Sequence, residues 1–237
     1  MNRHLAPTLF CLLASLSIGC AGSEDDGRSD DPILQRLGES TGLGLEQLAS
    51  IVERLFELPD AIEDPGMPPV GITYDSMSGA LVIEIDFDGD TVNDTTLSGN
   101  VVAATGNLTD GFDVGESFTV DWIASGLFTG NGSLECTLLA VGDLQLEGQG
   151  SLVATASTFQ FSITSPIHFD PRAPTLTPLT GVIGALDFDL SDGGDNLAGT
   201  IFPLVDEASV SVEYPAGSGF FLIFYVDYDS FMPYFED

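Results

Sequence analysis

The sequence is poor in basic residues. It contains no lysine and five arginines, against 37 acidic residues, so its formal net charge at pH 7 is −32. Recognition of the nucleic-acid backbone requires clustered cations, and the five arginines stand alone along the chain, which excludes nucleic-acid binding. The composition is nevertheless that of a folded protein, because 43% of the 237 residues are hydrophobic, enough to bury a core.

The first 19 residues have the organisation of a secretory signal peptide. They carry one cation, Arg3, followed by the apolar run Leu9–Ala14, which is too short to cross a bilayer as a stable helix. The segment ends in LSIGC, with Gly19 before Cys20. This motif resembles the lipobox of bacterial lipoproteins, and the resemblance covers about the first 22 residues.

The resemblance implies that the signal peptide, residues 1–19, is removed before Cys20, and that the sulfur and the new amino group of Cys20 are acylated. Several acyl chains hold a protein on a membrane almost permanently, since each buried methylene contributes ~0.8 kcal/mol. Ala21, in place of aspartate, implies forwarding to the outer membrane of the bacterial cell envelope. An ordinary secretory signal with a coincidental cysteine is the alternative interpretation.

Cysteine and histidine are scarce in the mature chain. With Cys11 removed and Cys20 acylated, Cys136 is the one free thiol, so no intramolecular disulfide can form. Cys136 lies in an apolar stretch with strand character, where we expect a buried small hydrophobic residue. His168 is the one mature imidazole, in the proline-bounded segment SPIHFDPRAP that we expect to be a loop. Neither a zinc site nor a Ser-His-Asp triad is expected.

The composition divides the mature chain into three parts. Residues 20–31 are small, polar and acidic, and we expect them to be a flexible tether that lifts the rest of the protein off the membrane. Residues 32–66 contain apolar positions at helical spacing. Residues 70–237 contain the alternating pattern of β-strands.

Two short amphipathic helices are predicted within residues 32–66. The first begins at the dipeptide Asp31–Pro32, a cap followed by a proline in the first turn, and ends at Gly38. The second runs from about Leu45 to Leu58, where Pro59 ends it. Short helices of this kind are not stable alone, so they must pack either on the β domain or on a partner protein.

The region 70–237 is predicted to be one antiparallel β domain. Short runs of alternating Val, Ile, Phe and Thr are separated by clusters of Gly, Asp and Asn. A sheet of this size must close or stack to protect its edges, so the predicted fold class is mainly β, an antiparallel β sandwich or barrel of about eleven strands with a short N-terminal two-helix element. The predicted strands are 70–75, 79–88, 96–105, 116–124, 133–140, 143–148, 150–164, 178–190, 196–203, 208–214 and 219–228.

The last of these strands begins the most aromatic part of the chain, the C-terminal run FFLIFYVDYDSFMPYFED. Phe221 and Ile223 alternate with Leu222 and Phe224, so both faces of the strand are apolar. Strands of this kind are typical of burial on both sides. We therefore expect this strand to be buried between layers or against the helices.

Two aspartate-rich segments resemble each other. SGALVIEIDFDGDTVNDTTLSGNV, from Ser78, aligns loosely with TGVIGALDFDLSDGGDNLAGTI, from Thr180, which predicts two similar hairpins, by duplication or by recurrent hairpin chemistry. Ca²⁺ takes six to eight oxygen ligands, which carboxylates clustered on a turn could supply. The alternative is a half-buried strand with a solvated acidic face. The candidate calcium ligands are Asp86, Asp88, Asp90, Asp94, Asp187, Asp189, Asp192 and Asp195.

These features favour a lipid-anchored envelope protein with a non-enzymatic structural or binding role. Its predicted partner is the membrane, through the lipid on Cys20, and no cofactor is expected other than the calcium considered above. A second hypothesis is a carrier of an apolar ligand, with a cavity lined by Phe159, Phe161 and Trp122. A third is a hydrolase of polysaccharides or esters, with paired carboxylates or with His168 beside a serine.

Overall fold

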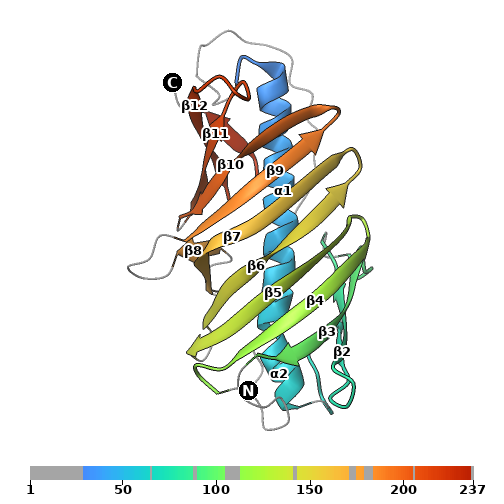
Figure 1. Ribbon diagram of the computed structural model, residues 1–237. Helices are drawn as coiled ribbons and strands as arrows, with labels where there is room; N and C mark the ends of the chain where they lie inside the picture. The colour runs from blue at the N-terminus through green and yellow to red at the C-terminus, as the bar shows by residue number, and fades with distance from the viewer. Residues whose placement is uncertain are drawn as a thin grey trace.

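Helices and strands account for most of the computed structural model (Figure 1). The predicted signal peptide, Cys20 and most of the predicted tether lie outside the described residues. Neither helix in the described residues is long and apolar enough to cross a membrane. The structure describes residues 29–64, 66–87, 90–104, 113–140, 143–170, 175–178, 184–204 and 206–235.

Two helices and thirteen strands are found in these ranges. The helices come first in the chain and the strands follow without another helix. The elements are α1 (Pro32–Phe56), α2 (Leu58–Glu63), β1 (Ile72–Tyr74), β2 (Ala80–Ile85), β3 (Thr95–Ala103), β4 (Ser117–Gly126), β5 (Thr129–Ala140), β6 (Asp143–Ala154), β7 (Ser157–Asp170), β8 (Thr175–Pro178), β9 (Ala185–Asp192), β10 (Asp195–Pro203), β11 (Glu207–Glu213), β12 (Phe221–Asp227) and β13 (Pro233–Phe235).

The strands form one open antiparallel sheet in the described part of the chain. Twelve of them follow one another in the order β1 to β7 and then β9 to β13, while β8 pairs with β7 off this path. The prediction of a mainly β, antiparallel fold is thus confirmed, but a sandwich or closed barrel is wrong. The edge strands β1 and β13 have three residues each, which leaves little unpaired backbone at the edges.

Helix α1 takes the place that a second sheet would have in a sandwich. It has 25 residues and is therefore about 37 Å long, and it contacts strands from both halves of the sheet, from β2 to β13. In Figure 1 the central strands cross α1 obliquely, and the two ends of the sheet turn toward the helix. The apolar face of one long helix covers the inner face of the sheet, so no second sheet is needed.

The predicted helix boundaries were wrong, because α1 continues through Gly38 and ends at Phe56, before Pro59. The glycines of α1 allow close contact with the sheet instead of ending the helix. A Cβ at Gly38 would lie 3.1 Å from Pro233, and a Cβ at Gly42 would overlap the carbonyl oxygen of Phe231. Tertiary packing thus outweighs the poor helix propensity of glycine. Pro59 lies in the first turn of α2.

Most predicted strands are present, but the boundary between β6 and β7 was misplaced. The predicted break falls at residue 149, with a new strand from Gly150, whereas β6 continues through Gly150, which pairs with Phe161. A Cβ there would come within 2.8 Å of the Phe161 ring, so glycine makes room for an aromatic side chain. The real turn is Thr155–Ala156, closed by a 3.0 Å hydrogen bond from Ser157 Oγ to the Ala154 carbonyl oxygen.

Candidate functional site

A groove crosses the outer face of the sheet, which points away from α1. It lies over β5, β6, β7 and β9 and has a volume of about 560 Å³. Its side chains come from positions that alternate with buried residues such as Phe161 and Phe188. A smaller hollow of about 290 Å³ continues it over β10 and shares Gln160 and Asp189. Eight polar side chains line the main groove: Asn131, Ser133, Gln149, Ser151, Gln160, Ser162, Asp187 and Asp189.

The strand register arranges these eight side chains in two rows across four strands. Neighbouring strands are about 4.8 Å apart, so each row is about 14 Å long, and the rows are about 7 Å apart because they are offset by two residues. This is a flat, extended array of hydrogen-bonding groups. The two rows are Ser133–Gln149–Ser162–Asp187 and Asn131–Ser151–Gln160–Asp189.

The chemistry of the rows is neutral at one end and acidic at the other. The amides on β5, β6 and β7 donate and accept hydrogen bonds, as the serine hydroxyls do, whereas Asp187 and Asp189 on β9 accept them. Asp187 is positioned by Thr200, whose Oγ1 donates a 2.7 Å hydrogen bond to Asp187 Oδ1. None of the residues that line the groove is basic. The groove therefore suits a ligand with many hydroxyl groups and no negative charge.

The residues expected to line an internal cavity are packed in the core. Trp122 lies over Gly132, where a Cβ would come within 2.5 Å of its ring, and Phe159 lies in the same way over Gly44 of α1. Phe159 also stacks on Phe188, with 5.7 Å between ring centroids. These aromatic rings fill the space between helix and sheet, and the two hollows described above are on the opposite face.

The first aspartate-rich segment is the turn between β2 and β3, and its carboxylates accept hydrogen bonds from the backbone of that turn. Asp86 accepts one from the Thr91 N–H at 2.9 Å, and Asp94 accepts one from the Phe87 N–H at 2.8 Å. Asp90 is in the same turn, and Asp88 lies outside the described residues. These carboxylates therefore stabilise the turn itself, as aspartates commonly do.

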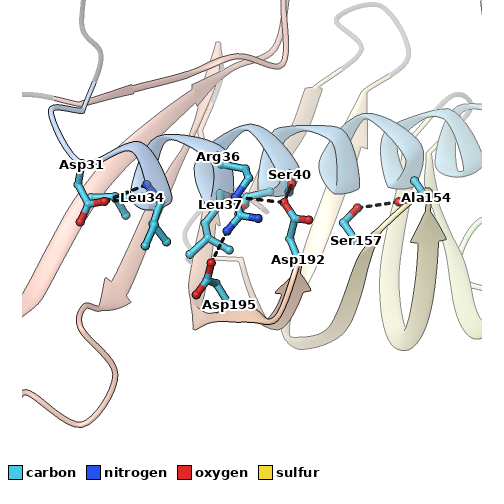
Figure 2. A network of polar contacts seen from close by, with 11 residues as sticks. Asp31, Leu34, Arg36, Leu37, Ser40, Ala154, Ser157, Asp192 and Asp195 are labelled. Carbon is cyan, nitrogen blue, oxygen red and sulfur yellow. Dashed lines mark hydrogen bonds and ion pairs between the residues drawn. The ribbon is translucent and has the colours of Figure 1, made fainter.

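In the second segment the four aspartates separate into two pairs. Asp187 and Asp189 lie in the outer groove, whereas Asp192 and Asp195 flank the two-glycine turn between β9 and β10 and face α1 (Figure 2). Arg36 of α1 forms ion pairs with both Asp192 and Asp195. Ser40 donates a 2.8 Å hydrogen bond to Asp192. This second pair attaches the helix to the sheet.

The calcium hypothesis gains no support from the described residues, among which no group of three or more His, Cys, Asp or Glu side chains could hold a metal ion. Calcium binding by the aspartates therefore stays a prediction, and one of the candidate ligands, Asp88, lies outside the described residues. The structure places His168 in β7, paired with Gln145 and Thr177, so the predicted loop was wrong. Pro166 fits in this strand because the pairing with β9 ends at Ser165.

Cys136 is fully buried, which confirms the prediction of a small core residue. Burial in apolar surroundings raises the pKa of its thiol far above the usual value, since the thiolate would lose its hydration. A neutral thiol is a weak nucleophile. Cys136 is therefore a structural residue.

Strand β12 differs from its prediction. Phe224 is buried as expected, but Phe221 and Ile223 on the other face are exposed, because no second layer among the described residues covers the outer face of the open sheet. Farther along the same face, Tyr225 stacks on Tyr234 of β13 with 5.2 Å between ring centroids. An apolar strip therefore runs along this end of the outer face.

Of the polar groove residues, only Asp187 and Asp189 were singled out from the sequence, as candidate calcium ligands, although the alternation of polar and apolar residues along β5, β6 and β7 was a usable signal for the others. The alternation does not show the strand order and register, which bring the polar side chains of four strands together. Comparison with known proteins adds no assignment: no protein-family model, no curated protein and no solved structure matches this chain.

Proposed function

We propose that this protein is a non-enzymatic, lipid-anchored protein of the bacterial cell envelope that binds a neutral polysaccharide in its outer groove. The lipobox-like motif and the acidic segment after it support an anchor at Cys20 in the outer membrane. The observation that carries the binding role is the pair of polar rows across β5, β6, β7 and β9.

Polysaccharides fit these rows in both shape and chemistry. Each sugar hydroxyl donates and accepts hydrogen bonds, and Gln149 and Gln160, on adjacent strands, each offer an amide N–H₂ and a carbonyl oxygen. Asp187 and Asp189 accept bonds from hydroxyls but repel uronates, phosphates and sulfates. A row about 14 Å long offers hydrogen-bonding groups to a short stretch of an extended polysaccharide chain. A neutral chain is therefore favoured over an acidic one.

The two groove carboxylates act as hydrogen-bond acceptors in this proposal. Asp187 and Asp189 stand two residues apart and project from the same face of β9. Residues so placed on a strand are about 7 Å apart, a separation that inverting glycosidases also use, so binding without hydrolysis is distinguished from catalysis by assay for released reducing ends.

The binding role is tested by titrating the mature protein with maltoheptaose, cellohexaose and polygalacturonate in a calorimeter. Gln149→Ala and Gln145→Ala form a matched pair, since both glutamines lie on β6 but Gln145 lies outside the groove. Loss of a hydrogen bond of about 1 kcal/mol predicts roughly fivefold weaker binding for Gln149→Ala and no change for Gln145→Ala. Equal losses in both variants, or preference for polygalacturonate, would contradict the proposal.

Two further measurements test the remaining parts of the proposal. Release of reducing ends from the neutral glycans, measured in the same samples, should stay at the level of the buffer; a protein-dependent release would show an enzyme. Mass spectrometry of the native N-terminal peptide should find acylated Cys20 as the first residue. A chain that begins at Met1, or an unmodified thiol at Cys20, would exclude the anchor.

A further inference from the structure

The turn between β11 and β12 carries the most exposed aromatic side chains in the described part of the chain. Phe220 is 73% exposed and Phe221 is 76% exposed, and Ile223 follows on the same face of β12. Single exposed apolar residues are common on protein surfaces, but adjacent aromatic rings of this exposure are not. We call Phe220, Phe221 and Ile223 the aromatic patch.

The aromatic patch lies at the point where the chain from Cys20 enters the fold. Tyr214, in the same turn, donates a 2.9 Å hydrogen bond from Oη to Asp31 Oδ2, and the Tyr214 N–H donates to the Phe220 carbonyl oxygen at 3.1 Å. Asp31 is the N-cap of α1. Figure 1 shows the first turn of α1 and the β11–β12 end of the sheet at the same end of the molecule.

The chain length between the acylated residue and the patch limits their separation. Cys20 lies eleven residues before Asp31, and eleven residues span at most about 40 Å even when fully extended. With its lipid in the bilayer, the protein thus keeps this end near the membrane surface, where the effective local concentration of lipid is high. The opposite end of α1 lies a further 37 Å or so away.

The acidic side chains at this end of the molecule determine which kind of membrane contact is favourable. Glu213 accepts a hydrogen bond from the Gly219 N–H in the same turn, Asp31 accepts one from Tyr214 of that turn, and Asp30 precedes Asp31 in the chain. These acids are repelled by anionic lipid, so attraction must come from apolar side chains. Aromatic rings are favoured at the boundary between headgroups and acyl chains.

We infer that Phe220 and Phe221 insert into the interfacial region of the bilayer that holds the lipid anchor, so that this end of the sheet faces the membrane and the outer groove is held at a fixed orientation to it. The inference rests on the proposed anchor at Cys20. The occupant of the aromatic patch is the bilayer itself, because the anchored chain brings this surface to it. A protein partner could bind the aromatic patch wherever the patch lay relative to Cys20, so the closeness of the patch to the anchored residue favours the bilayer.

The test uses the native acylated protein in phosphatidylcholine vesicles whose acyl chains carry bromine, which quenches nearby tryptophan. Phe220→Trp places an indole in the aromatic patch, and Ile123→Trp is the matched control, since Ile123 is 65% exposed on the outer face of β4 in the other half of the sheet. Trp122 is buried in both variants and gives a constant background. We expect at least a twofold loss of the added fluorescence for Phe220→Trp and none for Ile123→Trp.

The outcomes separate the membrane contact from the anchor. Equal quenching in the two variants, with acylated Cys20 seen by mass spectrometry, would overturn the membrane contact and leave the anchor standing. If the native peptide carries no lipid, the anchor is wrong. The same pair of variants, coupled through Cys20 to a maleimide-bearing lipid in the same vesicles, then tests the aromatic patch: selective quenching of Phe220→Trp supports it, and equal quenching overturns it.

Discussion

Replacement of Gly44 by alanine tests the close contact between α1 and the sheet. A Cβ at this position would lie 2.5 Å from Cγ, 2.7 Å from Cδ2 and 2.9 Å from Cβ of Phe159. Carbon atoms pack best at about 3.5–4.0 Å, so the ring or the helix must move by about 1 Å. The ring cannot retreat easily because it is stacked between Phe161 and Phe188.

Two opposing contributions set the size of the effect. Alanine is favoured over glycine by about 1 kcal/mol inside a helix, which alone would stabilise the protein. Overpacking of a filled core costs about 1–3 kcal/mol, and three contacts below 3.0 Å place Gly44→Ala at the upper end of that range. We expect a net loss of about 2 kcal/mol, which lowers Tm by roughly 4–8 °C in a domain of this size.

Urea unfolding followed by circular dichroism measures the change, and a double-mutant cycle identifies its cause. Phe159→Leu removes the ring atoms that an alanine at position 44 would meet, so the double variant should be more stable than the sum of the single effects predicts, by about 1 kcal/mol or more. Glu53→Ala, on the exposed side of α1, is the control for helix propensity. An unchanged or raised stability of Gly44→Ala, as propensity alone predicts, would refute the reasoning.

Three further predictions concern the thiol, the helix cap and the net charge. Cys136 should not react with a thiol reagent at pH 8 until the protein unfolds, because burial raises its pKa; rapid labelling of the native protein would contradict this. The hydrogen bond from Tyr214, together with those from the backbone, lowers the pKa of Asp31 in the folded state. The Asp31 carboxylate therefore stabilises the folded state at pH values above its unfolded pKa of about 3.9. This stabilisation is lost as the pH falls through the lower pKa of the folded state. The Tm difference between the native protein and Asp31→Asn should therefore be full at about pH 6 and shrink below about pH 4; a difference independent of pH would exclude this linkage. Finally, the net charge of −32 predicts a Tm that rises from low to near-molar NaCl, and a flat or falling Tm would show that self-repulsion is unimportant.

The strands could be predicted from the sequence because each carries a local pattern. In β9, for example, Leu186, Phe188 and Leu190 are buried and alternate with exposed aspartates, as an antiparallel sheet with one solvated face requires. The pattern fails where glycine has a packing role, as at Gly150. It also fails at the Thr155–Ala156 turn, where Thr155 adopts a positive φ of 52° without a glycine or asparagine to indicate it.

The second layer of the fold could not be predicted from local patterns. Helix propensity predicts that a helix ends at Gly38. The residue that packs against Gly38, Pro233 of β13, lies 195 positions later in the sequence, so a local pattern does not reveal this contact. The exposure of Phe221 has the same origin, since a strand with two apolar faces is typical of burial and the uncovered outer face of the sheet is a property of the whole fold. The groove likewise depends on register between strands.

The contact between Asp31 and Tyr214 joins residues that are 183 positions apart, while nearly every strand pairs with the next one in the sequence. During synthesis the N-terminal helix emerges first, yet its contacts with β12 and β13 are made last. Neighbouring hairpins can assemble quickly from local contacts, but the part of α1 that contacts β12 and β13 stays uncovered until these final strands are made. A chain interrupted late in synthesis therefore carries a helix with an exposed apolar surface, to which chaperones and proteases bind.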